Sequence, residues 1–184
     1  MSEGVPARPL RLFVACDLPG PALQAVVAWQ RERLGDHDEL RLLSSLHLTL
    51  AFLGDVGSDA VPVLERVLGT VRWSPAQTAI GGPLFLPAHG RRRVVALELE
   101  DPDGRLAALQ SEVSGILVKE GLYRPEKRPW LPHVTVARFR RPGHPFSLQN
   151  VNFPEFGVVR MVLYSSDLKQ AGAVHTPIAD FPAS

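Results

Sequence analysis

Cysteine is nearly absent from this sequence, since Cys16 is the only one among 184 residues. A lone cysteine cannot form an intramolecular disulfide, so redox cross-linking cannot stabilise the fold. Because Cys16 lies inside an apolar run, we expect it to be a small buried hydrophobic residue. The 45% hydrophobic content is ample for a packed interior.

Long hydrophobic runs are also missing. The longest apolar run near the N-terminus, residues 12–16, is far too short to span a bilayer, and no signal-peptide pattern precedes it. We therefore expect no membrane association and a cytoplasmic location. Because no long linker or low-complexity tract divides the chain either, we expect one domain over residues 1–184.

A large excess of one charge is lacking as well, because 20 Lys and Arg residues face 19 Asp and Glu residues. This balance argues against a protein that binds nucleic acid by bulk electrostatics. The positive charges are nevertheless gathered, with six basic residues against one Glu in residues 124–141 and three arginines in residues 91–93. Of the 20 basic residues 17 are Arg, the side chain suited to bidentate phosphate contacts. The alternative is a solvated basic rim without a ligand.

What the sequence does contain is a repeated tetrapeptide. His-Leu-Thr-Leu at residues 47–50 returns as His-Val-Thr-Val at residues 133–136. The alternating pattern predicts a β-strand in each copy, with His and Thr on one face and the aliphatic residues in the core. Each strand therefore presents an imidazole and a hydroxyl side by side.

The remaining pattern predicts helices and strands in alternation, joined by short turns. The predicted strands cover residues 10–17, 47–53, 77–84, 93–99, 133–140, 146–151, 158–165 and 173–178, and the predicted helices cover residues 22–34, 58–68 and 104–119. Residues 35–41 are predicted to be a loop, and Gly54 is predicted to end the first motif strand. This order favours an α+β fold of mostly antiparallel sheet, with two pseudo-symmetric lobes, helices packed outside and a groove between the lobes.

Such a groove would be lined by two His and two Thr side chains. Two imidazoles can serve as general acid and general base near neutral pH, which is what phosphodiester cleavage needs. The hydroxyls of Thr49 and Thr135 can donate hydrogen bonds to the phosphate oxygens that gain charge. The scheme requires no metal or other cofactor.

Other interpretations of these residues are less favoured. A purely structural role for both histidines gives no reason for Thr to recur in step, and no third ligand for zinc accompanies either copy. Ser44 and Ser45 lack the context of a nucleophile elbow. Trp130 can stack on a base, although an aromatic beside a proline is more often packing. The other histidines are expected in surface turns and loops, namely His37, His89, His144 and His175.

The two motifs with their flanks, residues 47–54 and 128–138, resemble the 2H phosphoesterase superfamily. They are most similar to its branch of bacterial and archaeal RNA 2′,3′-cyclic phosphodiesterases, also called the LigT-like or 2′-5′ RNA ligase family. Residues 11–19 and 163–168 fit that branch too, so the resemblance runs nearly end to end.

The resemblance implies metal-independent hydrolysis of a terminal 2′,3′-cyclic phosphate to a 2′-phosphate. It implies that His47 donates a proton to the departing 3′ oxygen, that His133 accepts one from water, and that Thr49 and Thr135 hold the phosphate. Arg138 matches a family arginine, yet strict alternation places it on the face opposite His133, so it reaches phosphate only if the strand twists or bulges. Trp130 stands where the family commonly has Phe.

Three alternatives stay open from the sequence. The same chemistry would suit a reversible 2′-5′ RNA ligase or a phosphodiesterase for a small cyclic nucleotide, and the basic segment would suit an RNA-binding module without turnover. The expected partner is RNA or a nucleotide with a 2′,3′-cyclic phosphate terminus. We expect a monomer with no obligate protein partner.

Overall fold

The computed structural model describes residues 9–149, 153–169 and 172–184. Its helices are α1 (Gly20–Leu34), α2 (Val61–Leu68) and α3 (Arg105–Lys119), and a 3₁₀ turn (Ser58–Ala60) precedes α2. Its strands are β1 (Pro9–Asp17), β2 (Leu40–Leu42), β3 (His47–Gly57), β4 (Ala76–Thr78), β5 (Ile80–Leu86), β6 (Arg92–Leu99), β7 (His133–Gly143), β8 (Phe156–Val158), β9 (Arg160–Lys169) and β10 (Gly172–Pro182).

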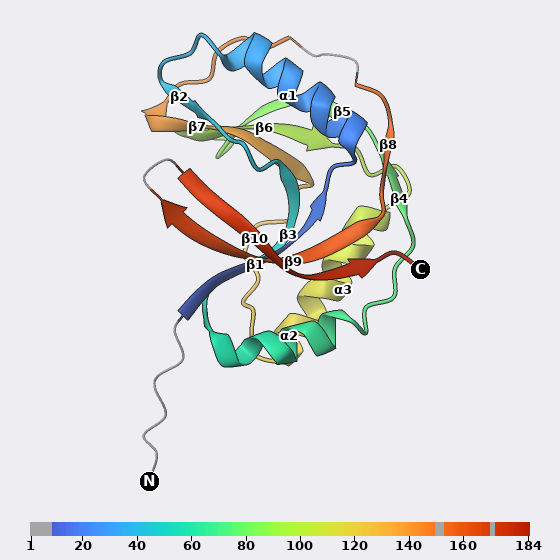
Figure 1. Cartoon of the computed structure of the whole chain (residues 1–184). Coiled ribbons are helices and arrows are strands. Elements are labelled where there is room, and N and C mark those ends of the chain that lie inside the picture. Colours follow the sequence, from blue (N-terminus) through green and yellow to red (C-terminus); the bar gives the residue numbers. More distant parts are fainter. Residues whose placement is uncertain (1–8, 150–152, 170–171) are drawn as a thin grey trace.

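One antiparallel sheet runs through the molecule in the order β10-β9-β1-β3-β7-β6-β5, and β2 adds to β7. Its centre is the junction between β3 and β7, the two motif strands. These strands share a single residue pair, Leu48 with Val134, whereas the pairings β1–β3 and β6–β7 are long. The sheet therefore divides into two lobes that meet at the motif strands (Figure 1). The predicted α+β fold with two lobes of antiparallel strands is confirmed.

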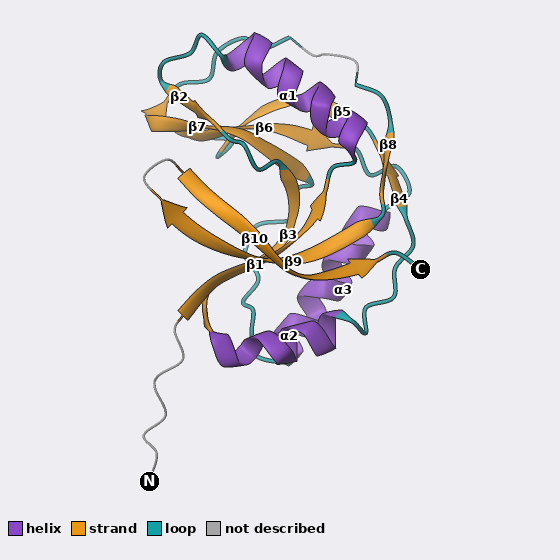
Figure 2. Ribbon diagram, in the orientation of Figure 1, coloured by secondary structure: helices purple, strands orange, loops and turns teal. Residues whose placement is uncertain are grey.

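Each lobe is covered by a helix that follows a strand of the other lobe. Helix α1 follows β1 in the chain but packs against β2 and β7, and α3 follows β6 but packs against β3. Helix α2 lies beside α3, so that α1 and the α2–α3 pair flank the sheet from two sides (Figures 1 and 2). The exchanged helices tie the two lobes together through the chain itself.

Local sequence explains the sharp beginning of α3. The Asp101 carboxylate accepts hydrogen bonds from the backbone N–H groups of Leu106 and Ala107, at 3.0 and 2.8 Å, which satisfies free donors of the first turn. Gly104 adopts φ +70°, a conformation that strongly favours glycine. The buried face of the helix is the predicted apolar stripe, with Leu106, Leu109, Val113 and Leu117.

Several predicted boundaries were wrong. The end of the predicted loop, residues 40 and 41, belongs to β2, because Leu40–Leu42 pair with β7. Gly54 does not end β3, since it pairs with Leu12 of β1 just after an irregularity at Leu53, and the strand continues to Gly57. Residues 77–84 belong to two strands, β4 and β5, rather than one. Residues 146–149 form no strand, and residues 150–151 lie outside the described residues.

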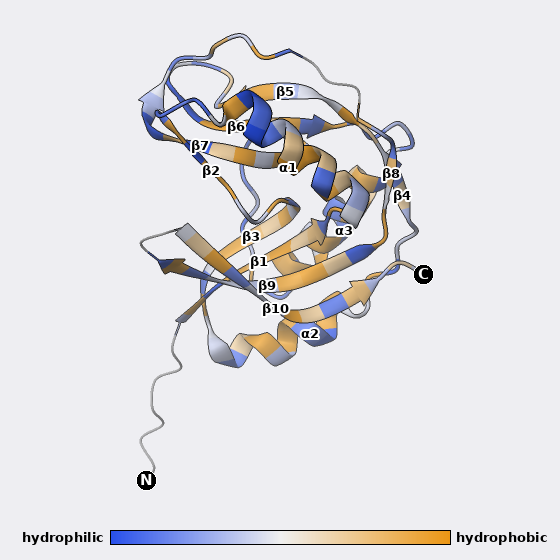
Figure 3. Ribbon diagram, turned by 45° about the horizontal axis from the view of Figure 1, so that its top comes forward, coloured by the Kyte–Doolittle hydropathy of each residue, from blue (hydrophilic) through white to orange (hydrophobic). Residues whose placement is uncertain are grey.

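The core fills the space between the sheet and its helices, and hydrophobic residues colour the central strands β1 and β3 (Figure 3). Cys16 is fully buried in β1, as predicted, and burial raises the pKa of its thiol. Across the three described ranges, no helix has the length and apolar character needed to cross a membrane.

Candidate functional site

A groove of about 620 Å³ lies where the two lobes meet. Its lining comes from β1, β3, β9 and β10 of one lobe, and from β2, β7 and the segment between β2 and β3. Such a volume falls in the range of small-ligand sites, about 300–1,000 Å³. The predicted residues His47, Thr49, Thr135 and Arg138 all line it.

The register at the junction places the two motifs in a mirrored arrangement. Because Leu48 pairs with Val134 in antiparallel fashion, His47 lies across from Thr135 and Thr49 lies across from His133. Leu48 and Val134 are buried on the opposite face. Each lobe therefore contributes one imidazole and one hydroxyl to the same side of the sheet.

Both motif strands contain a bulge at the last residue of the motif. In β7 the pairing with β6 shifts at Val136, so Val136 and Ala137 are both buried and Arg138 returns to the groove side. From strict alternation, Arg138 was expected to reach the groove only if the strand twists or bulges, and β7 does bulge at this point. In β3 the pairing with β1 shifts at Leu50, and Phe52 faces the groove in the same way.

A glutamine from the covering helix holds each bulge. Gln30 of α1, which is buried, donates hydrogen bonds to the carbonyl oxygens of Val136 and Leu43. Gln110 of α3 donates to the carbonyl oxygen of Leu50 at 3.3 Å. The exchanged helices thus fix the backbone turn that aims a side chain into the groove.

His133 has a defined tautomer. Its Nδ1 lies 2.7 Å from the carbonyl oxygen of Leu131. Because a carbonyl oxygen only accepts hydrogen bonds, Nδ1 carries the proton, and Nε2 of the neutral ring has a free lone pair. The His133 ring is thus arranged to accept a proton at Nε2.

His47 lies in a different environment. Its ring stacks on Phe13 at 4.9 Å between centroids, and its Nδ1 is 3.5 Å from the Ser45 hydroxyl. The pKa of the ring is lowered to about 4, mainly by burial and to a lesser extent by the nearby His175 and His133, while Asp17 opposes the shift. The influence of His133 on His47 shows that the two motif imidazoles lie within range of each other's charge.

His175 was placed wrongly by the sequence analysis. It belongs to β10 and lines the groove, with its ring edge-on to His47 at 5.4 Å between centroids. Burial lowers its pKa. No motif marks this residue, and only the pairing of β10 with β9 brings it to the site.

Arginines gather at the groove from distant parts of the sequence. Arg11 of β1 and Arg41 of β2 line it together with Arg138. The guanidinium of Arg11 lies over the Phe52 ring, 4.7 Å from its centroid. Arg41 pairs in register with Arg138 across β2 and β7. Neither Arg11 nor Arg41 was singled out from the sequence.

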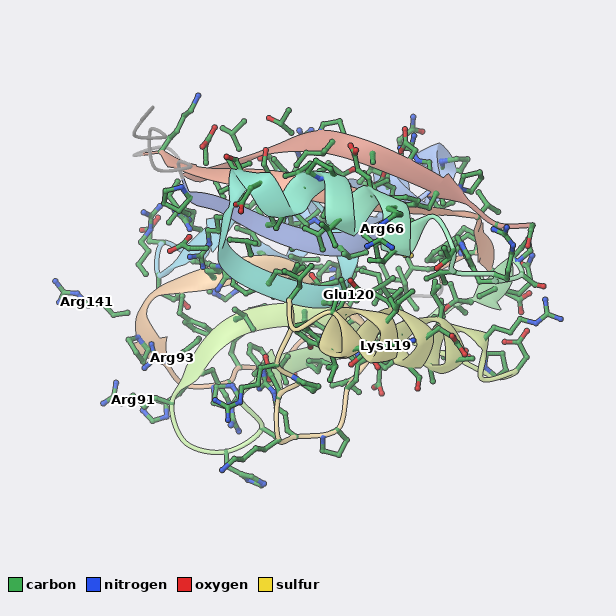
Figure 4. All side chains as sticks on the ribbon, turned by 90° about the horizontal axis from the view of Figure 1, so that it is seen from below. Arg66, Arg91, Arg93, Lys119, Glu120 and Arg141 are labelled. Carbon is green, nitrogen blue, oxygen red and sulfur yellow. The ribbon has the colours of Figure 1, made fainter. Side chains whose placement is uncertain are left out.

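Most of the basic residues predicted near the second motif lie elsewhere. Arg128 pairs with Glu126, and Arg140 donates to the carbonyl oxygen of Asp38. Arg91, Arg93 and Arg141 project from the outer end of β6 and β7 (Figure 4). Among the basic residues of the segment 124–141, Arg138 is the one that lines the described groove.

Trp130 packs against the core beside the site. Its indole N–H donates to the carbonyl oxygen of Thr49 at 3.1 Å, which links the segment before β7 to β3. This contact orients Thr49 by its backbone. A stacking role for Trp130 stays a prediction.

Within residues 9–149, 153–169 and 172–184, no three His, Cys, Asp or Glu side chains are grouped to hold a metal ion. The polar side chains that line the groove carry imidazoles, hydroxyls, guanidinium groups and the ammonium group of Lys169.

Comparisons with known proteins place this chain in a family. The chain is 27% identical over 176 residues to the RNA 2′,3′-cyclic phosphodiesterase of Escherichia coli, covering 94% of this chain and 96% of the relative. It is 34% identical over 146 residues to the enzyme of the same name from Methanothermobacter thermautotrophicus, covering 74% and 78%. The crystal structure of E. coli LigT complexed with 3′-AMP superimposes with a TM-score of 0.82 at 26% identity, covering 96% and 99%. A family model described as the 2′-5′ RNA ligase superfamily matches residues 19–168, and the chain therefore belongs to that superfamily.

Proposed function

We propose that this protein hydrolyses the 2′,3′-cyclic phosphate at the end of an RNA to a 2′-phosphate. The observation that carries the proposal is the mirrored pair of His and Thr side chains at the β3–β7 junction. The relatives named RNA 2′,3′-cyclic phosphodiesterase support the reaction, and the LigT complex with 3′-AMP supports a nucleotide in the groove.

The two imidazoles divide the proton transfers. Nε2 of His133 accepts a proton from water as the water oxygen forms its bond to phosphorus. The bond between phosphorus and the 3′ oxygen then breaks, and His47 donates a proton to that oxygen. The carbonyl oxygen of Leu131 supports this assignment, because it keeps the proton of neutral His133 on Nδ1 and stabilises the imidazolium that forms.

The phosphate is bound by groups that favour developing negative charge. The hydroxyls of Thr49 and Thr135 donate to its non-bridging oxygens from the two lobes. Arg138 adds a permanent positive charge, which the bulge in β7 aims at the same place. Binding and charge stabilisation thus come from the side chains that surround the two histidines.

His47 must carry a proton before it can donate one. With a pKa of about 4 it is neutral at pH 7 in the free protein, because burial and its neighbours disfavour the imidazolium. A bound phosphate places negative charge beside the ring and favours the imidazolium. Substrate binding therefore raises the pKa of His47 and recruits the proton that the reaction uses.

This shift can be measured directly. We expect the His47 ring to titrate near pH 4 in the free protein and at a higher pH when the groove is saturated with inorganic phosphate. Ring ¹H–¹³C NMR spectra, assigned with His47→Gln, report both values. An unchanged titration on phosphate binding would contradict the proposed proton uptake.

The activity itself is tested with a nucleoside 2′,3′-cyclic phosphate and with an oligoribonucleotide that ends in one, in buffer containing EDTA. We expect turnover in EDTA, and a 2′-phosphate product identified by ³¹P NMR. Salt-dependent RNA binding without hydrolysis of either substrate would favour a binding module instead.

Three further expectations accompany the proposal. A single domain over residues 1–184, a monomeric state and a cytoplasmic location stay predictions. Size-exclusion chromatography with light scattering measures the oligomeric state.

A further inference from the structure

The groove holds more positive charge than one phosphate requires. Its lining includes Arg11, Arg41, Arg138 and Lys169, and no carboxylate is among the described lining residues. The ion pairs found in the described part of the chain involve none of the three arginines. These guanidinium groups are therefore available to a ligand.

The positive charges of these arginines repel one another when no anion is bound between them. Arg41 and Arg138 are cross-strand neighbours, and like charges at such positions destabilise a sheet. Partial burial lowers the pKa of Arg138, and the charges of Arg41 and Arg11 lower it further. Anions bound between these side chains would relieve the repulsion.

Strand pairing places the two cross-strand arginines, Arg138 and Arg41, at different distances from the reacting phosphate. Arg138 follows Thr135 on β7, next to the place of the reacting phosphate, whereas Arg41 stands one strand away on the edge strand β2. An RNA end carries a second phosphate one nucleotide from the cyclic one, in the linkage to the preceding nucleotide. A mononucleoside cyclic phosphate lacks it.

We propose that Arg41, together with Arg11, which lines the same groove from β1, binds the phosphodiester that precedes the terminal nucleotide. The inference rests on the proposed function and makes the substrate an RNA chain rather than a mononucleotide. A guanidinium can form paired hydrogen bonds to the two non-bridging oxygens of such a linkage. Arg41 is exposed at an edge strand, so its removal leaves the core intact.

The test compares two substrates that differ in this one phosphate, a nucleoside 2′,3′-cyclic phosphate and a dinucleotide ending in the same cyclic phosphate. We expect the wild type to prefer the dinucleotide in kcat/KM. Arg41→Ala should lower kcat/KM for the dinucleotide roughly 10- to 100-fold, the loss of a charge-assisted contact, and leave the mononucleoside unchanged. Arg41→Lys should recover part of the preference, because it keeps the charge without the fork.

Arg93→Ala is the matched control. It removes the same charge from β6, and strand alternation places Arg93 on the face opposite Val94, which pairs with Arg138. Figure 4 shows Arg93 at the outer end of the molecule. We expect this variant to keep the dinucleotide preference.

The outcomes separate the two proposals. Equal wild-type turnover of both substrates, or equal losses on both substrates in Arg41→Ala, would overturn the second phosphate site and leave the phosphodiesterase intact. No turnover of either substrate by the wild type would overturn the proposed function and this inference with it.

Discussion

Replacing His47 or His133 by alanine is expected to lower kcat for hydrolysis of a 2′,3′-cyclic phosphate roughly 10²- to 10⁴-fold, the usual contribution of a positioned acid or base. Each imidazole is placed from a different lobe, and no other described histidine occupies an equivalent position on a motif strand. His175 lines the groove but lies edge-on to His47, so it does not replace His133. Single-turnover and steady-state assays at pH 7 measure the loss.

The double variant is informative as well. Residues that act as a unit are not additive, so we expect His47→Ala with His133→Ala to lose little more than the worse single variant. His89→Ala removes an exposed imidazole from a turn outside the groove and is the matched control. Wild-type activity in either single variant, with the fold confirmed by circular dichroism, would exclude the two-histidine mechanism for this chain.

The sequence predicted the centre of this molecule because the motif is local and repeated. Alternation places His and Thr on one face of each strand, and the echo between residues 47–50 and 133–136 indicates that the two faces meet. The structure places His47, Thr49 and Thr135 at one groove, and the pairing of Leu48 with Val134 puts His133 across from Thr49 on the same side of the sheet. The α+β class followed from the same periodicities, since most helices and strands were long enough to show them.

The groove-facing positions of Arg138 and Arg41 could not be predicted, because they depend on contacts between residues that are distant in the sequence. Whether Arg138 faces the groove depends on the bulge at Val136 in β7, and Gln30 of helix α1 holds this bulge by a hydrogen bond. Neither feature leaves a mark in the alternation of β7. The same holds for Arg41, because β2 is three residues long and exists only by pairing with β7. Short edge strands have too little periodicity of their own to be predicted.

The position of a basic residue along the chain does not show whether it lies at the groove. Counting charges along the chain located a basic segment, but the arginines at the groove come from β1, β2 and β7. Sequence proximity to His133 was a poor guide, because β7 carries Arg141 to the outer end of the molecule (Figure 4). Strand pairing rather than composition decides which cations share a site.

The junction between the lobes predicts a second large effect. Leu48 is 1% exposed and forms the single pair that joins β3 to β7. Leu48→Ala removes buried volume at this point, and we expect it to lower the free energy of unfolding by roughly 2–5 kcal/mol, as measured by urea denaturation. Because the two histidines are positioned across the same pair, we also expect kcat to fall by up to about 10²-fold in the folded protein.

Leu64→Ala separates these two effects. Leu64 is fully buried in α2, away from the residues that line the groove, so its truncation should cost similar stability while kcat stays unchanged. Both variants are assayed at a temperature and urea concentration at which each is folded. Equal kcat in the two variants would mean that packing at Leu48 does not position the histidines. A lower kcat in Leu48→Ala alone would tie catalysis to the register of the two motif strands.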